Sequence, residues 1–212
     1  MTLVLDFENR QLFTSAGDVF SPLDRSWGHV ETGKPAGRKV SPVEAVNWLQ
    51  SASGYPCRVP VGVIGGREAN PEQLALAEDM GVRLARMGLT LLCGGRQGIM
   101  EAACRGAASA GGMSVGILPD ADPAMANPYV TVPIATGLGV ARNALVARAA
   151  LCLVAVGGGY GTISEIAFGL QFEKNVFGLA DGPRIEGIHL CADAAQAADG
   201  VARTVLGLPQ MM

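Results

Sequence analysis

The stretch from residue 150 to residue 165 constrains the fold of this chain more than any other. Seven mostly apolar residues, 150–156, run directly into the glycine-rich turn 157–161, and Thr162 then opens a helical segment from Ile163 to Gln171. Glycine allows positive φ and lets a ligand approach the backbone closely. The free N–H groups and the dipole of a helix start favour an anion, typically a phosphate. We therefore expect a phosphorylated ligand at this turn, held by Gly158, Gly159, Tyr160, Gly161 and Thr162.

From residue 58 onward, short apolar runs alternate with helical patterns, which predicts a parallel sheet with helices on both faces. The fold class that we expect is a Rossmann-like, doubly wound α/β domain. The expected strands are 59–64, 89–93, 114–118, 129–134, 150–156, 175–179 and 187–190. The expected helices are 71–87, 99–110, 138–149, 163–171 and 193–206.

Glycines and charged residues follow four of these strands. In parallel sheets of this kind, ligands bind beyond the carboxyl ends of the strands. A nucleotide-sized site at that edge would use the turn 157–161 together with residues that follow three other strands. These residues are Gly65, Gly66, Gly94, Gly95, Arg96 and Asp120.

Residues 1–57 have a different pattern, so we divide the chain into an N-terminal extension, 1–57, and a main domain, 58–212. Apolar residues alternate over 3–7 and 12–14, which predicts a β-hairpin. Residues 21–40 are expected to be irregular. Ser41-Pro42-Val43-Glu44 has the form of a capping box and predicts a short helix to Gln50.

The charge and the apolar runs exclude some partners. The net charge is −3 and no basic cluster occurs, so nucleic acid is not an expected partner. No apolar run reaches the roughly 18 residues of a membrane span. The chain start lacks the pattern of a signal peptide, and five scattered cysteines suit a reducing compartment, so we expect a cytoplasmic protein without a structural metal site.

Several common nucleotide folds do not fit. The only lysines are Lys34, Lys39 and Lys174, and none lies beside a glycine turn, which rules out a Walker A loop and disfavours pyridoxal phosphate chemistry. The glycines at 157, 159 and 161 also lack the Gly-x-Gly-x-x-Gly spacing of a dinucleotide site.

Two motifs resemble the signatures of the Lonely Guy (LOG) family, whose members were long mislabelled as lysine decarboxylases. They are Gly94-Gly95-Arg96-Gln97-Gly98-Ile99-Met100 and Gly158-Gly159-Tyr160-Gly161-Thr162-Ile163-Ser164-Glu165. The resemblance implies a Rossmann-like fold, a homodimer or higher homo-oligomer, and hydrolysis of nucleoside 5′-monophosphates to a free base and ribose 5-phosphate without a required cofactor. It also implies that Arg142 and Glu165 act in catalysis.

Two departures from the LOG pattern point to an alternative function. Gly157-Gly158-Gly159 stands where the family usually has Pro-Gly-Gly, and Arg142-Asn143 stands in place of Arg-Lys. The segments 137–142 and 153–157 look like those of the molybdenum cofactor carrier proteins. The alternative function is therefore a non-enzymatic carrier of molybdenum cofactor, or a nucleotide sensor, with the phosphorylated pterin as cargo.

Each candidate residue also has a purely structural interpretation. Thr162-x-x-Glu165 has the spacing of a capping box, so Glu165 is either a cap or a ligand-facing carboxylate. Arg142 is either a phosphate or ribose clamp or a solvated arginine at a helix end. Arg96 is either a phosphate ligand or a surface charge.

Overall fold

The computed structural model describes residues 2–29 and 36–210. The chain forms two compact units, one of residues Met1–Cys57 with Asp199–Met212 and the other of residues Arg58–Ala198. The division of the chain into 1–57 and 58–212 as separate domains stays a prediction.

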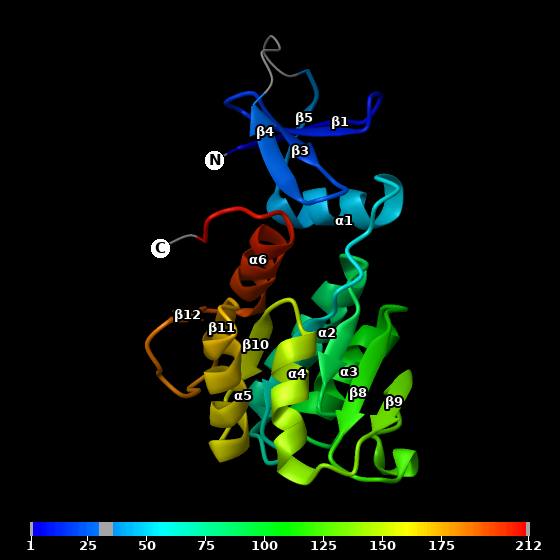
Figure 1. The fold of residues 1–212 in the computed structure, drawn as a ribbon, viewed down its shortest axis with the longest axis vertical. Helices are drawn as coiled ribbons and strands as arrows, with labels where there is room; N and C mark the ends of the chain where they lie inside the picture. Colours follow the sequence, from blue (N-terminus) through cyan, green and yellow to red (C-terminus); the bar gives the residue numbers. More distant parts are fainter. Residues whose placement is uncertain (1, 30–35, 211–212) are drawn as a thin grey trace. The chain divides into compact units, whose positions relative to one another are not determined.

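The unit of residues 58–198 contains a parallel sheet of seven strands (Figure 1), and this confirms the predicted α/β fold. Its strand order is β12-β11-β10-β6-β7-β8-β9. The strands are β6 (Val61–Gly65), β7 (Leu91–Cys93), β8 (Ser114–Leu118), β9 (Val132–Ala135), β10 (Leu153–Val156), β11 (Val176–Leu179) and β12 (Ile188–Leu190).

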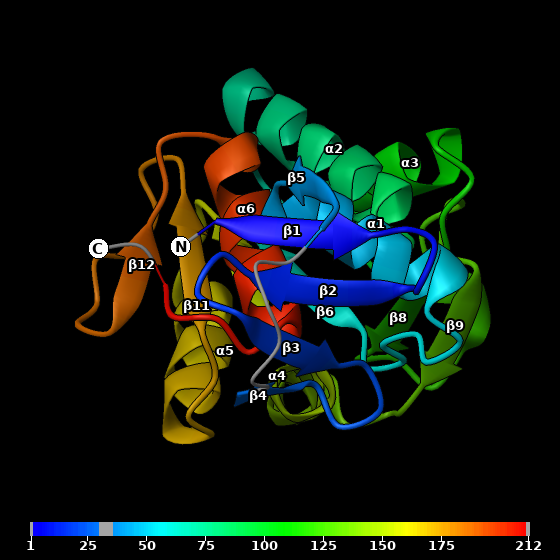
Figure 2. The same cartoon turned by 90° about the horizontal axis from the view of Figure 1, so that it is seen from above.

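Helices cover both faces of this sheet. Helices α4 and α5 lie on one face, and α2 and α3 lie on the other, as the two perpendicular views agree (Figures 1 and 2). These helices are α2 (Pro71–Arg86), α3 (Ile99–Ser109), α4 (Asn143–Ala149) and α5 (Tyr160–Gln171), with 3-10 turns η1 (Pro123–Met125) and η2 (Gly139–Arg142). Helix α6 (Ala194–Val205) begins in this unit and ends in the other. Because both faces are covered, strands such as β10 are buried along their whole length.

The sheet changes direction between β6 and β10. From β6 the chain adds β7, β8 and β9 on one side, and it then returns to add β10, β11 and β12 on the other. In open α/β sheets such a switch leaves a crevice beyond the carboxyl ends of the two central strands. The turns at residues 65–66 and 157–161 follow these two strands.

Local signals set several helix ends as predicted. Asn70 caps α2 through a capping box with Gln73, and Pro71 occupies the first helical position. Gly88, at φ +75°, ends this helix in the left-handed conformation that glycine adopts without cost.

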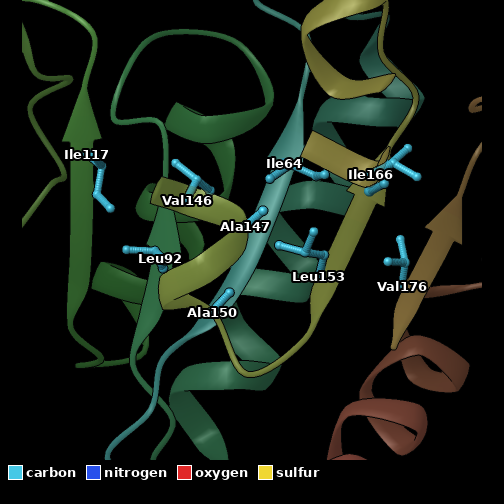
Figure 3. Close-up of a cluster of buried hydrophobic side chains, with 10 residues drawn as sticks. Ile64, Leu92, Ile117, Val146, Ala147, Ala150, Leu153, Ile166 and Val176 are labelled. Carbon is cyan, nitrogen blue, oxygen red and sulfur yellow. The ribbon is translucent and has the colours of Figure 1, made fainter. Parts of the chain in front are cut away.

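The core on the α4–α5 side of the sheet is aliphatic (Figure 3). Val146 and Ala147 of α4 pack over Ile64 of β6 and Leu92 of β7, and Ile166 of α5 belongs to the same cluster. Burying each of these larger side chains stabilises the fold by about 1.5–3 kcal/mol. This packing fixes α4 and α5 relative to the ends of β6 and β10.

The N-terminal unit contains an antiparallel sheet of five strands in the order β4-β3-β2-β1-β5 (Figure 2). The predicted hairpin is its β1–β2 pair, in which Leu3 lies opposite Thr14. The predicted capping box at Ser41 and Glu44 is confirmed. The elements are β1 (Leu3–Asp6), β2 (Gln11–Thr14), β3 (Asp18–Ser21), β4 (Ser26–His29), β5 (Arg38–Val40) and α1 (Pro42–Ala52).

The expectation of irregular structure over 21–40 was wrong for residues 26–29 and 38–40, which form β4 and β5. A tight turn joins β3 to β4, with Arg25 at φ +56° and its N–H bonded to the Ser21 carbonyl at 2.8 Å. Pro22 therefore marks a turn between two short strands, and Gly28 lies inside β4. Residues 30–35 of that expectation lie outside the described residues.

Two other boundaries differ from the prediction. The segment 138–149 is divided into η2 and α4, and Arg142 stands at their junction. Helix α5 begins at Tyr160, three positions before the predicted start at residue 163. In the part of the chain that the structure describes, no helix combines the length and the apolar character that a membrane span requires.

Candidate ligand-binding site

A cleft of about 440 Å³ opens where the sheet changes direction, and its volume is in the range of small-molecule sites. Its lining comes from the turn after β6, the η2–α4 junction, the start of α3 and the first turns of α5. The lining residues are Gly65, Gly66, Arg67, Met100, Val140, Arg142, Asn143, Gly159, Gly161, Thr162 and Glu165.

The start of α5 opens onto this cleft. Gly159 is the N-cap residue and makes no side-chain capping bond. The first N–H groups of an α-helix have no partner within the helix, so those of this turn are available to a ligand. Gly159 has open space where a side chain would stand. A phosphate can therefore reach the backbone at this point.

The capping box that was the alternative interpretation of Thr162 and Glu165 does not form, because Gly159 is the N-cap of α5. Thr162 is the third residue of α5 rather than its cap, and its side chain packs beneath Gly158. A Cβ added at Gly158 would lie 2.3 Å from the Thr162 hydroxyl oxygen. Glu165 does not cap the helix, because α5 begins one turn earlier than the Thr-x-x-Glu spacing suggests.

Glu165 instead forms a buried ion pair with Arg142 at the cleft. Nη1 of Arg142 donates to Oε1 of Glu165 at 2.9 Å, and the two side chains are only 9% and 7% exposed. Burial raises the pKa of Glu165 to about 7, against the opposing effect of the Arg142 charge and hydrogen bond. The carboxyl group can therefore exchange a proton near neutral pH.

Arg142 has unused hydrogen-bonding capacity. Its Nε is buried and has no hydrogen-bond partner among the described residues. A buried donor without a partner costs about 1–3 kcal/mol, and such groups are common at functional sites. Arg142 is therefore a cleft residue rather than the solvated helix-end arginine that was the alternative interpretation.

Gly94 leaves the space that Arg142 occupies. A Cβ at Gly94 would lie 2.2 Å from Nη2 of Arg142 and 2.9 Å from Sδ of Met100. The glycine at the end of β7 thus serves the site indirectly, by admitting the guanidinium group.

Asn143 was not predicted as a site residue, yet it joins the two halves of the cleft. Its Oδ1 accepts from Nη1 of Arg142, and its Nδ2 donates to Oγ of Ser164 at 2.8 Å and to the Gly161 carbonyl at 3.3 Å. These bonds hold the η2–α4 junction against the first turn of α5. The departure from the Arg-Lys pair of the LOG pattern was the only sequence signal at this position.

Arg96 and Asp120 pair with each other. Nη1 of Arg96 lies 2.5 Å from Oδ2 of Asp120, which joins the turn after β7 to the end of β8. The described residues that line the cleft do not include Gly95, Arg96 or Asp120. The structure thus leaves these three predicted contacts outside the cleft.

Of the other residues predicted to bind the ligand, some line the cleft and others lie outside it. Gly65, Gly66, Gly159, Gly161 and Thr162 line the cleft. Tyr160 is 92% exposed, and Gly158 supports the turn through its contact with Thr162. Arg67, Met100 and Val140 line the cleft without having been predicted. The position of Arg67, directly after the Gly65-Gly66 turn, was the signal that could have indicated it.

The fold and the cleft together define a Rossmann-like protein of the LOG type. The chain belongs to the SLOG cluster4 family, whose model matches residues 58–204. This finding confirms the resemblance to the LOG superfamily that the two glycine motifs indicated.

Several proteins are similar to this chain. The molybdenum cofactor carrier protein of Chlamydomonas reinhardtii is 37% identical, with a TM-score of 0.65 over 71% of this chain and 100% of that chain. The molybdenum cofactor binding protein of Rippkaea orientalis is 32% identical, with a TM-score of 0.62 over 66% and 92%. An uncharacterized protein of Archaeoglobus fulgidus is 42% identical over 130 residues, which is 61% of this chain and 85% of its own length.

Proposed function

We propose that this protein binds a phosphorylated pterin, the molybdenum cofactor, in the cleft between the turns after β6 and β10, and that it acts as a carrier. The observation that carries the proposal is the uncapped glycine start of α5, which opens onto the cleft beside the Arg142–Glu165 pair. The likeness to two molybdenum cofactor proteins at 32–37% identity favours the pterin as cargo.

The cleft chemistry suits such a cargo. The α5 N–H groups would bind the phosphate, and Arg142 and Asn143 offer polar groups to the rest of the ligand. Met100 and Val140 supply apolar surface for a planar ring.

Purification from the source organism tests the carrier proposal. Native mass spectrometry and elemental analysis should find pterin and molybdenum bound to the wild-type protein. Gly159→Asp should lose both, because it places a carboxylate at the phosphate position. Aspartate is also a preferred N-cap, so this variant should fold at least as well.

Gly159→Asn is the matched control for that experiment, because it caps the helix without adding charge. It should retain more cargo than Gly159→Asp. Wild-type protein free of pterin and molybdenum would contradict the carrier proposal. Equal loading of the two variants would contradict the assignment of the phosphate to the start of α5.

A second candidate function is hydrolysis of nucleoside 5′-monophosphates, and the pKa of Glu165, raised to about 7, favours it. In this reaction the Glu165 carboxylate takes a proton from water, and the hydroxide forms a bond to the anomeric carbon. The N-glycosidic bond breaks, and the base leaves with its electron pair and takes up a proton. Arg142 would hold the substrate.

Incubation with AMP and related monophosphates, followed by chromatography for the free base, tests this candidate. Release of base by the wild-type protein that Glu165→Gln abolishes would favour the hydrolase over the carrier. Absence of base across the panel would contradict it.

We also infer that the protein forms a homo-oligomer, as the LOG resemblance implies. Neighbouring helices α4 and α5 present the partly exposed apolar side chains Leu145, Ile163 and Phe168, which supports a contact between copies. Sedimentation analysis should find a dimer or larger species, and Phe168→Glu should reduce it. A monomer at all concentrations would contradict the inference.

A further inference from the structure

Three arginines lie beyond the carboxyl ends of the strands, Arg67 after β6, Arg96 after β7 and Arg142 at the η2–α4 junction, and two of them are paired with a carboxylate. Arg142 pairs with Glu165, and Arg96 pairs with Asp120. No carboxylate in residues 2–29 or 36–210 forms an ion pair with Arg67. The charged residues in the cleft lining are Arg67, Arg142 and Glu165, so Arg67 supplies its net positive charge.

The backbone of Arg67 is held in place although its side chain is exposed. The N–H of Ile99 donates to the Gly66 carbonyl at 3.1 Å. A Cβ at Gly98 would lie 2.2 Å from the carbonyl oxygen of Arg67, so the start of α3 packs directly against this loop. Arg67 therefore projects from a fixed point on the cleft wall.

This loop lies beside the glycine turn of α5. A Cβ added at Gly66 would come within 3.9 Å of the Cα of Gly158. Gly66, Arg67, Gly159 and Gly161 line the same cleft. The free arginine and the uncapped helix start thus face one space from neighbouring turns. The adjacent carboxylate, Glu68, is absent from the described lining residues and does not cancel the charge inside the cleft.

We propose that Arg67 binds the phosphate monoester of the ligand together with the N–H groups at the start of α5, and that it makes the cleft selective for phosphorylated over unphosphorylated ligands. The inference rests on the proposed binding of a phosphorylated ligand, and it identifies Arg67 as the side chain that binds the phosphate charge. A guanidinium group binds phosphate through two parallel hydrogen bonds, which a helix start alone does not provide.

Calorimetric titration with AMP, adenosine, ribose 5-phosphate and ribose tests this proposal. Wild-type protein should bind each phosphorylated probe more tightly than its unphosphorylated counterpart. Arg67→Gln should weaken binding of the phosphorylated probes about tenfold to a hundredfold and leave the others unchanged. Arg67→Lys should retain part of the preference, because it keeps the charge but loses the two-pronged geometry.

Arg105→Gln is the matched control, because it removes the same charge from α3 at a residue outside the described cleft lining. It should bind all four probes as the wild type does. Phosphate preference that persists in Arg67→Gln, or an equal loss in Arg105→Gln, would overturn the assignment of Arg67 alone. Wild-type protein without any preference for the phosphorylated probes would overturn the phosphate site at the start of α5, on which the proposed function rests, so the two failures are distinguishable.

Discussion

The two glycine turns of this protein, residues 94–98 after β7 and residues 157–161 after β10, look alike in sequence but differ in surroundings. In the first turn, a Cβ at Gly94, Gly95 or Gly98 would meet another atom within 2.6 Å. In the second, Gly159 has nothing within 4 Å, and Gly161 only the Asn143 amide at 4.0 Å. One turn is closed by protein atoms, and the other contains open positions.

This difference separates two uses of glycine. In the closed turn, the missing side chains admit neighbouring protein groups, which are the guanidinium of Arg142 at Gly94 and the Arg67 loop at Gly98. In the open turn, Gly159 and Gly161 leave space along the cleft that a ligand can occupy. We infer that the first turn builds the site and the second contacts the ligand.

The largest effect should follow substitution in the closed turn at Gly98. Gly98→Ala would set a methyl group against backbone carbonyl groups that cannot move aside, at a φ of +72°. We expect it to lower the free energy of unfolding by about 3–5 kcal/mol. Urea denaturation measures this. Gly111→Ala, at φ +74° with nothing within 4 Å, is the control and should lose only the conformational part, about 1–2 kcal/mol. Equal losses would contradict the closed-turn interpretation.

Gly94→Ala should have the next largest effect, because it displaces the Arg142 guanidinium from its place beside Glu165. Breaking a buried ion pair costs about 3 kcal/mol or more. In the wild-type protein the charge of Arg142 lowers the pKa of Glu165. The pKa should therefore rise above 7 in this variant. Carboxyl carbon NMR would follow this titration, and an unchanged pKa would exclude the proposed displacement.

The wild-type pair should make stability depend on pH. The pKa of Glu165 in the folded state is about 7, against an ordinary value of 4.5, so the folded state binds this proton more tightly than the unfolded state. The resulting stabilisation is complete below pH 4.5 and is lost as the pH rises through 7. It amounts to about 3 kcal/mol or less. The free energies of unfolding of wild type and Glu165→Gln should be similar near pH 4.5, where both side chains are neutral. As the pH rises through 7, the wild type should fall below the variant by this amount, and a difference that does not change with pH would contradict the shift.

The smallest effect on stability should come from the open turn. Gly161→Ala places a methyl group in free space in the first turn of α5, where alanine favours the helix by up to about 1 kcal/mol. Ligand affinity should nevertheless fall about tenfold, because the methyl group blocks approach to the backbone. Thermal unfolding and calorimetric binding of AMP test both parts. A stable variant with wild-type affinity would show that no ligand contacts this turn.

The parallel sheet and the positions of both glycine turns could be predicted from the chain alone. Apolar runs, helix caps such as Asn70 and glycine turns are local signals that act within a few residues. Strands β4 and β5 could not be predicted. Strand β4 is largely exposed and has no alternating apolar pattern, although it pairs with the neighbouring strand β3. Strand β5 has only three residues and is stabilised by pairing with β1, which is distant in the chain.

Local sequence patterns could not predict the ion pair between Arg142 and Glu165. Thr162-x-x-Glu165 has the spacing of a capping box, and only the earlier start of α5 at Tyr160 directs Glu165 toward the cleft. That start depends on how α5 packs against β10 and α4. The role of Asn143 is likewise set by contacts with Gly161 and Ser164 on another helix.

Local chemistry in the chain was thus sufficient for the fold class and for a phosphate-type turn, because strand, turn and helix signals are short-range. Packing between distant segments decided which glycines are open, which arginines are neutralised and which carboxylate faces the cleft. Charge compensation and close packing depend on side chains brought together from separate strand ends. Arg67, Arg96 and Arg142 are chemically identical in the sequence, and only their neighbours in space distinguish them.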